Sequence, residues 1–244
     1  MNPNHTIEKM RAMRMKTMAE LYHQNLSEGL PGELSTDEFL AMLVQAEWEE
    51  RQTRRITRLI KQAGFRLQAV PTDIDYHARR GLDKTQITRL LSLSFIGKAE
   101  NIILTGPTGV GKSWLGQAIG HQACQRQIKT RYFGTAHFFD RAKLTRLEGT
   151  YSKFMKTLNK TPLLILDDFG LHPMDPTDRG LLLDLIDARH GRASTILCSQ
   201  IPVSSWHQVI GEGTMADAIL DRVVYSSHRI ELNGESMRKK QRLN

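Results

Sequence analysis

The stretch that most constrains the fold is GPTGVGKS, Gly106 to Ser113, which directly follows the apolar run NIILT, Asn101 to Thr105. Its spacing is G-x-x-x-x-G-K-[ST], in which glycines let consecutive backbone N–H groups curve around phosphate oxygens. The motif requires a strand before the loop and a helix after it, because the helix N-terminus adds a favourable dipole. The sequence therefore predicts a phosphate-binding loop between a strand and a helix.

Length and composition set the scale of the fold. The chain has 244 residues, of which 40% are hydrophobic, so it can bury one large domain core and a small accessory domain. Its apolar runs are far shorter than the roughly 20 residues of a membrane span, and the N-terminus has no apolar signal region. We expect a globular, cytoplasmic protein without a membrane partner. Cys124 and Cys198 are not spaced as a metal pair and are expected to be small buried residues.

From about residue 100 the chain alternates short apolar runs with helical stretches, which indicates a parallel sheet flanked by helices. After NIILT, one strand intervenes between Lys112 and the acidic pair Asp167 and Asp168. That order is typical of P-loop proteins in which an additional strand separates the loop strand from the acidic strand. The predicted later strands are TRYF (130–133), PLLILD (162–167), STILCS (194–199) and HRIEL (228–232).

The first hundred residues have helical patterns. Residues 7–24 are expected to be helical, and STDE, Ser35 to Glu38, has the Ser-x-x-Glu spacing of a capping box. A long helix should begin there and end near Gly64. We therefore expect a helical N-terminal domain for DNA or partner binding (1–70), a connector (71–99) and a nucleotide-binding domain (100–244). Only twelve residues follow Leu232, so no C-terminal lid domain is expected.

Candidate nucleotide chemistry lies at the ends of the predicted strands, where ligands bind in open α/β sheets. Lys112 is expected to reach the terminal phosphates, while Ser113 and Asp167 would hold Mg²⁺. Asp168 would orient or deprotonate the attacking water, and Gln200 after the fourth strand would sense the γ-phosphate. Packing is the alternative for Trp114, and a loop role is the alternative for Gln200. The predicted ATP-binding residues are Gly106, Pro107, Thr108, Gly109, Val110, Gly111, Lys112, Ser113 and Trp114.

A late arginine is the candidate for catalysis across a subunit interface. Arg222 lies in ADAILDR, Ala216 to Arg222, where an arginine at a helix end could reach the nucleotide of a neighbouring subunit. A surface salt bridge to a local acid is the alternative. The role in catalysis requires self-association.

The net charge of +8 is concentrated in two stretches. Residues 51–66 carry six basic residues and no acid, and residues 126–160 carry nine basic residues against Asp140 and Glu148. Such concentration favours a nucleic-acid partner, with a solvated helix face as the alternative. No base-reading motif is present, so weak sequence preference is expected. The candidate DNA contacts are Arg51, Arg54, Arg55, Arg58, Lys61, Lys153 and Lys156.

The order of these motifs resembles the IstB-like ATP-binding proteins, transposition helper ATPases of the AAA+ superfamily that are related to replicative helicase loaders. The resemblance covers nearly the whole chain and is carried by GPTGVGKS, EGTY from Glu148, LLILDDFG from Leu163, LDR from Leu220 and GESMR from Gly234. It implies a three-layer α/β AAA+ core with a five-stranded parallel sheet after a small all-helical domain. It also implies DNA-stimulated ATP hydrolysis, ATP-dependent oligomers on double-stranded DNA, and a partner transposase. Hydrolysis is expected to be slow, because Asp168 is one methylene shorter than the Glu that many AAA+ proteins have at this position.

Three other functions remain open at this stage. A helicase loader would prefer single-stranded DNA and bind a hexameric helicase. A metabolic P-loop kinase would require a lid and an acceptor pocket, against which the helical basic N-terminal region argues. A pure scaffold would hold nucleotide without turnover. The resemblance also leaves two details unassigned, namely the role of Arg238 and the effect of Asp168 where many AAA+ proteins have a longer Glu.

Overall fold

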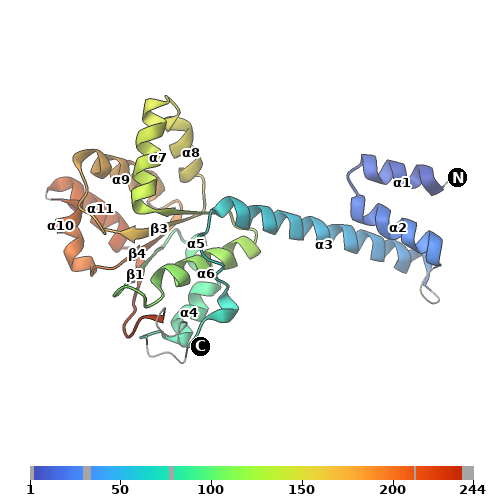
Figure 1. The fold of residues 1–244 in the computed structure, drawn as a ribbon, viewed down its shortest axis with the longest axis horizontal. Helices are drawn as coiled ribbons and strands as arrows, with labels where there is room; N and C mark the ends of the chain where they lie inside the picture. Colours follow the sequence, from blue (N-terminus) through green and yellow to red (C-terminus); the bar gives the residue numbers. More distant parts are fainter. Residues whose placement is uncertain (1–2, 30–33, 77–79, 212, 238–244) are drawn as a thin grey trace. The chain divides into compact units, whose positions relative to one another are not determined.

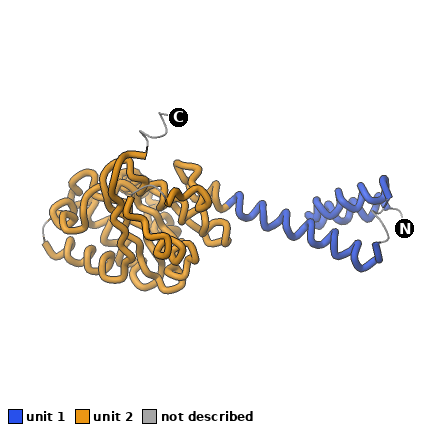
Figure 2. Tube along the Cα trace, turned by 90° about the horizontal axis from the view of Figure 1, so that it is seen from below, with its two compact units in different colours: residues 1–58 blue, residues 59–244 orange. Residues whose placement is uncertain are grey.

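The computed structural model describes residues 3–29, 34–76, 80–211 and 213–237. The chain forms two compact units, Met1–Arg58 and Leu59–Asn244 (Figure 2). The division falls inside helix α3 (Thr36–Ala63), earlier than the expected boundary at residue 70. The reason is that the chain after Arg58 forms hydrogen bonds to other residues of the second unit. Gln117 Oε1 accepts hydrogen bonds from the backbone N–H groups of Arg66 and Leu67, at 2.8 and 2.9 Å.

The first unit is helical, as the sequence predicts (Figure 1). The helical pattern over residues 7–24 is divided between two helices, with a break where Arg14 has a φ of 61°. The capping box is confirmed, because Ser35 N donates to Glu38 Oε2 at 2.8 Å and Glu38 N donates to Ser35 Oγ at 3.3 Å. Gly64, with a φ of 75°, follows the end of α3. The other helices of this unit are α1 (Pro3–Ala12) and α2 (Lys16–Glu28).

A buried glutamate joins α2 to α3. Glu47 Oε2 accepts from the backbone N–H groups of Thr17 and Met18, at 3.0 and 3.1 Å, so a side chain of α3 caps the first turn of α2. Its Oε1 accepts from Arg51 Nε at 2.8 Å. Burial opposes ionisation of this carboxyl, but the hydrogen bonds and charge of Arg51 and the bond from Met18 N outweigh it and lower the pKa of Glu47.

The second unit is built on a five-stranded parallel sheet in the order β2-β3-β4-β1-β5. Strand β4 lies between β1 and β3, which confirms the additional strand expected next to the loop strand. Strand β3 runs two residues further than expected, because Phe169 still pairs with Ser199 of β4 after a register shift. The strands are β1 (Asn101–Thr105), β2 (Thr130–Gly134), β3 (Leu163–Phe169), β4 (Ser194–Ser199) and β5 (Ser227–Glu231).

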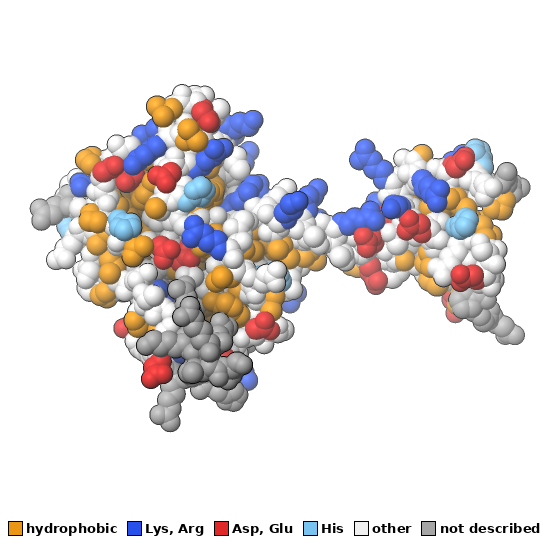
Figure 3. Space-filling model, in the orientation of Figure 1, with side chains coloured by type: hydrophobic (Ala, Val, Ile, Leu, Met, Phe, Trp, Pro, Cys, Tyr) orange, Lys and Arg blue, Asp and Glu red, His pale blue; other side chains and the backbone are white. Residues whose placement is uncertain are grey.

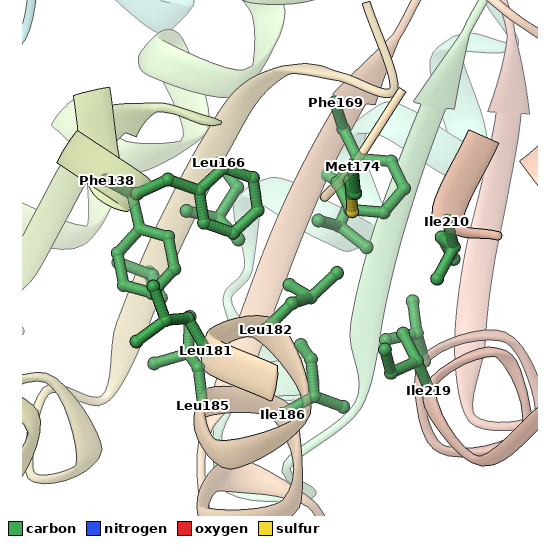
Figure 4. Packing of buried hydrophobic residues seen from close by; sticks show 14 of the residues in the cluster. Phe138, Leu166, Phe169, Met174, Leu181, Leu182, Leu185, Ile186, Ile210 and Ile219 are labelled. Atoms are coloured by element: carbon green, nitrogen blue, oxygen red, sulfur yellow. The ribbon is translucent and has the colours of Figure 1, made fainter. Parts of the chain in front are cut away.

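Helices cover both faces of this sheet, which gives three layers (Figure 1). Alternate residues of each strand enter different cores: Ile102 and Leu104 pack toward α6, whereas Ile103 packs toward α9. Figure 4 shows the second core, in which Leu166 and Phe169 lie opposite helix α9. The helices are α6 (Lys112–Gln125), α7 (Thr135–Leu147), α8 (Tyr151–Asn159), α9 (Pro176–Arg189), α10 (Trp206–Ile210) and α11 (Thr214–Val224).

The expected connector, residues 71–99, is part of the folded second unit. Its side chains Ile87, Leu90 and Phe95 are buried in the core on the α6 side of the sheet. Asp83 caps its first α-helix by accepting from Thr85 N at 2.7 Å. Its elements are a 3₁₀ helix (Pro71–Asp73), α4 (Lys84–Leu91) and α5 (Ser94–Gly97). Outside this segment, a second 3₁₀ helix (Val203–Ser205) lies between β4 and α10. No helix in the described ranges is long and apolar enough to cross a membrane.

A buried arginine ties three elements together at the amino ends of the strands. Arg189 is 1% exposed, and burial lowers its pKa to about 10. Its guanidinium donates to the carbonyl oxygens of Leu158, Thr161 and Ser194, and its Nε donates to Thr195 Oγ1 at 3.1 Å. The side chain therefore satisfies carbonyl groups at the end of α8 and the beginning of β4.

We expect Arg189→Met to lower the free energy of unfolding by about 3 kcal/mol or more, because several buried carbonyl groups lose their donor at once. Urea denaturation followed by circular dichroism measures this change. The matched control is Arg192→Met, because Arg192 lies three residues later in the chain and is exposed. This change should leave the midpoint of urea denaturation unchanged. Equal midpoints for the two variants would show that the carbonyl groups find other donors.

We expect Glu47→Ala to lower the free energy of unfolding of the first unit by about 1–2 kcal/mol, the usual cost of a lost helix cap. Amide exchange of residues 16–28 in the full-length chain should accelerate, whereas Glu49→Ala, at an exposed position of the same helix, should leave it unchanged. Because folding lowers the pKa of Glu47 from its ordinary value of 4.5, this stabilisation is complete above pH 4.5 and is lost as the pH falls through the folded value. Slow exchange that persists in the alanine variant would contradict the capping role.

Candidate nucleotide-binding site

The glycine-rich loop joins β1 to α6, as the motif requires. Gly106, Gly109 and Gly111 all have positive φ values, of 138°, 86° and 100°. All three also face neighbours at close range. A side chain on Gly106 would overlap the carbonyl oxygen of Leu232, and one on Gly109 would overlap the side chain of Ser236. A Cβ on Gly111 would lie 2.7 Å from Arg80 Nη1. Both conformation and space therefore demand glycine here. Helix α6 begins at Lys112, so its first N–H groups point into the loop.

Polar side chains gather around this loop. Lys112 is 6% exposed, and its Nζ donates to the carbonyl oxygen of Pro107 at 2.7 Å. Gln200, just after β4, lies beside the loop because its Oε1 accepts from Thr108 Oγ1 at 2.7 Å. Trp114 is half-buried and packs against the apolar core on the α6 side of the sheet, which agrees with the packing alternative.

The carboxylate of Asp167 is buried beside the loop. It is 4% exposed, and its Oδ1 accepts from Ser113 Oγ at 2.8 Å and from the backbone N–H of Asp168 at 3.0 Å. A hydroxyl and a carboxylate at this distance form the hard oxygen donor set that suits Mg²⁺. The first strand contributes the loop and the third contributes the acid, so the sheet order brings the two predicted metal ligands together.

Two further side chains hold Asp167, and neither belongs to a nucleotide-binding motif. Tyr132 Oη donates to Asp167 Oδ2 at 2.7 Å, and Thr135 Oγ1 donates to the Asp167 carbonyl oxygen at 2.8 Å. Burial, together with the neighbouring Asp167 carboxylate, raises the pKa of the Tyr132 phenol well above its ordinary value. Sequence reasoning missed both contacts. Tyr132 lies inside β2 and Thr135 begins α7 directly after that strand, so their approach to Asp167 depends on the pairing of β2 with β3.

The second acid of the pair has a different environment. Asp168 adopts the left-handed region, with a φ of 55°, which is uncommon for a residue other than glycine. It lines a cavity of about 250 Å³ that Arg66, Thr135 and Gly170 also line. The two neighbouring acids are thus separated: Asp167 is enclosed beside Ser113, and Asp168 faces an open cavity.

Two contacts to the loop come from segments that lie outside the phosphate-loop motif itself. Arg80 is buried, which lowers its pKa, and its guanidinium donates to the carbonyl oxygens of Val110 and Asp75 at 3.3 and 2.7 Å. The segment GESMR reaches the loop as well, since Met237 N donates to the Gly109 carbonyl oxygen at 2.9 Å. Arg238 lies outside the described residues.

Arg222 lies at the other end of the sheet. Its backbone carbonyl accepts from Asn101 Nδ2 at 3.4 Å, at the start of β1, whereas the phosphate loop follows the end of that strand. The guanidinium pairs with Asp187 of α9 at 2.8 Å, which is the local salt bridge given as the alternative. Within its own chain, Arg222 is therefore separated from the loop by the length of β1, about 13 Å for four residue steps.

The candidate DNA contacts are exposed, but they differ in their partners. On α3, Arg51 pairs with Glu47 at 2.8 Å and Arg54 pairs with Glu50 at 2.6 Å. Arg55, Arg58 and Lys61 are also exposed, and the structure places no carboxylate within 4.0 Å of them in the described part of the chain. In the second unit, Lys153 and Lys156 are exposed on α8.

Solved structures with the same fold include proteins of DNA replication. The crystal structure of the DnaI protein superimposes with a TM-score of 0.59 at 20% identity, over 72% of this chain and 93% of that one. The DnaC helicase loader gives a TM-score of 0.54 at 21% identity, over 61% and 86% of the two chains. AMPPCP-bound DnaA from Aquifex aeolicus gives 0.53 at 21% identity, over 64% and 49%. At these identities the similarity establishes the AAA+ fold.

Sequence comparison establishes the family. An insertion-sequence ATP-binding protein of Sinorhizobium fredii is 42% identical over 97% of both chains. The ATP-binding protein of insertion sequence IS21 from Pseudomonas aeruginosa is 31% identical over 94% of this chain and 87% of its own length. The family model of the IstB-like ATP binding protein matches residues 8–244. The chain therefore belongs to the family of IstB-like ATP-binding proteins.

Proposed function

We propose that this ATPase regulates transposition: with ATP it assembles as an oligomer on double-stranded target DNA, and there it recruits or stimulates a partner transposase. The observation that carries the proposal is the set of exposed cationic side chains on α3 and α8 in an ATP-binding chain whose relatives belong to insertion sequences. The basic helix faces supply attraction to phosphates, and the phosphate loop supplies a nucleotide-dependent switch.

The nucleotide and its metal ion would occupy the loop and the adjacent strand end. Backbone N–H groups between Gly106 and Lys112 are suited to the phosphates, and Lys112 Nζ can exchange the Pro107 carbonyl for a phosphate oxygen. Ser113 Oγ and the Asp167 carboxylate would hold Mg²⁺. Bound there, Mg²⁺ would neutralise charge on the terminal phosphates.

Hydrolysis would rest on Asp168 and Gln200. Asp168 faces the open cavity, so its carboxylate can accept a proton from a water molecule, while the adjacent Asp167 is enclosed by three donors. The hydrogen bond between Gln200 and Thr108 of the loop supports a role for Gln200 in binding the γ-phosphate or the attacking water. Arg222 would act only across a subunit interface, after release from Asp187.

Each unit would contribute DNA contacts of its own. In the second unit, a groove of about 500 Å³ brings Lys153 of α8 together with Arg131 of β2 and Arg141 of α7. Phe133 and Phe154 also line this groove, so apolar and cationic groups lie side by side. On the face seen in Figure 3, Lys and Arg side chains gather over α7 and α8 and along α3. Phosphate contacts of this kind would give affinity without sequence preference.

We expect Asp168→Asn to bind ATP normally but to hydrolyse it about 10²–10⁴-fold more slowly, the usual loss when a general base is removed. Because bound ATP then persists, protein–DNA particles formed with ATP should outlast those of the wild type. ATP turnover and light scattering of the same samples measure both effects. Asp184→Asn, an exposed aspartate on α9, is the control. Hydrolysis by Asp168→Asn at the wild-type rate would exclude Asp168 as the base.

We expect the triple change of Arg54, Arg55 and Arg58 to Gln to weaken binding to all duplex sequences. Each lost phosphate contact should reduce the slope of log K against log salt by about 0.9. Titrations of labelled duplexes at several salt concentrations, with ATP or ADP, measure the slope. Unchanged affinity and slope would show that this helix face is only solvated. Three exposed arginines of the second unit serve as the control when changed together: Arg89, Arg192 and Arg229.

The same titration separates the proposed function from the alternative of a helicase loader. Preference for the duplex, confined to the ATP state and accompanied by growth into a large particle, supports the transposition function. Preference for single strands would favour the loader instead. Absence of binding to either DNA in every nucleotide state would refute both.

A further inference from the structure

The orientation of the Asp167 carboxylate depends on a residue that no nucleotide-binding motif contains. Tyr132 of β2 is 6% exposed, and its phenol donates to Asp167 Oδ2 at 2.7 Å. The other oxygen, Oδ1, faces Ser113 Oγ and Asp168 N. The carboxylate is therefore held from both sides, with its Ser113-facing oxygen at the proposed metal position.

The pairing of β2 with β3 explains how the phenol reaches this carboxylate. Gly134 lies opposite Asp167 in the parallel register, and Tyr132 lies two residues earlier, on the same face of the sheet. A diagonal neighbour of this kind is within reach of a long aromatic side chain. The residue directly opposite Asp167 has no side chain, so nothing from β2 stands between the phenol and the carboxylate.

A second residue covers the tyrosine. The guanidinium carbon of Arg66 lies 5.8 Å from the centre of the Tyr132 ring, and Arg66 Nη2 would be 3.0 Å from a Cβ on Gly134. The Arg66 backbone is itself fixed to Gln117 of α6, one turn after Ser113. Gly134 therefore leaves room both for the hydrogen bond and for the cation that lies over the ring.

We infer that Tyr132 is a positioning residue for the metal site: its phenol fixes the Asp167 carboxylate in the orientation that binds Mg²⁺ together with Ser113, and Arg66 holds the ring in place. The inference rests on the proposed role of Asp167 as a metal ligand. A partner that orients a metal-binding side chain typically contributes about 10–100-fold to metal affinity or activity. A hydrogen bond that served only the fold would leave the Mg²⁺ requirement unchanged.

The test is nucleotide binding as a function of Mg²⁺, measured with a fluorescent ADP analogue on the full-length chain. Tyr132→Phe keeps the ring and its packing but removes the donor. In EDTA, we expect this variant to bind the ADP analogue with the same affinity as the wild type. With Mg²⁺ present, it should need an Mg²⁺ concentration about ten times higher to reach half of the metal-dependent gain in affinity. A wild-type Mg²⁺ requirement in Tyr132→Phe would overturn the inference.

Two controls identify the cause of any change. Tyr151→Phe removes a similar phenol-to-aspartate bond, to Asp184 at 2.9 Å between α8 and α9, and should leave the Mg²⁺ requirement unchanged. Asp167→Asn should abolish the metal-dependent gain. If Asp167→Asn instead responds to Mg²⁺ like the wild type, the metal assignment itself fails and the inference fails with it. If Asp167→Asn loses the gain while Tyr132→Phe keeps it, only the inference about Tyr132 fails.

A variant that restores the donor separates the hydrogen bond from the stability of the fold. Tyr132→p-aminophenylalanine retains the ring and places an N–H donor where the hydroxyl was. We expect its Mg²⁺ requirement to return to within about threefold of the wild-type value, because a neutral donor again meets Asp167 Oδ2. Its thermal midpoint in EDTA should equal that of the wild type. This variant also keeps the test available if Tyr132→Phe does not fold. An Mg²⁺ requirement raised tenfold despite the restored donor would overturn the inference.

Discussion

The nucleotide site depends on one buried carboxylate that several elements hold in common. Asp167 belongs to β3, yet it accepts from Ser113 at the start of α6 and from Tyr132 of β2. A buried carboxylate is tolerated only when its oxygens are satisfied, so the three elements must be assembled before the site exists. The parallel sheet provides this assembly. Strand β4 lies between β1 and β3, and all three strands run in the same direction, so the loop after β1 and the acid near the end of β3 lie at the carboxyl ends of the strands.

The loop is shaped by its neighbours as much as by its own glycines. The carbonyl oxygen of Leu232 occupies the space where a side chain of Gly106 would lie, and Arg80 lies against Gly111. Segments far apart in the sequence therefore form the outer wall of the phosphate loop. The motif specifies which residues bind phosphate, while the chain before β1 and the chain after β5 determine how tightly that backbone is held.

The sequence predicted the elements of this fold more reliably than their contacts. Strands β1 and β4 and the capping box at Ser35 follow from local patterns and are confirmed. The extension of β3 to Phe169 could not be predicted, because it depends on a register shift against β4. Tyr132 was missed for the same reason: its contact with Asp167 requires knowledge of which strand lies beside β3 and in which register.

Basic residues in this chain divide into three physical classes that composition alone does not distinguish. Arg189 is buried and satisfies carbonyl groups, and Arg51 and Arg54 are exposed but neutralised by glutamates one turn earlier. Only the third class, which includes Arg58 and Lys153, is exposed without such a partner in the described residues. Under the proposed function, DNA phosphates would compete with these glutamates for the arginines of the second class, which lowers the contribution of those arginines to binding. The proposed attraction to DNA should therefore depend on the third class rather than on the net charge of +8.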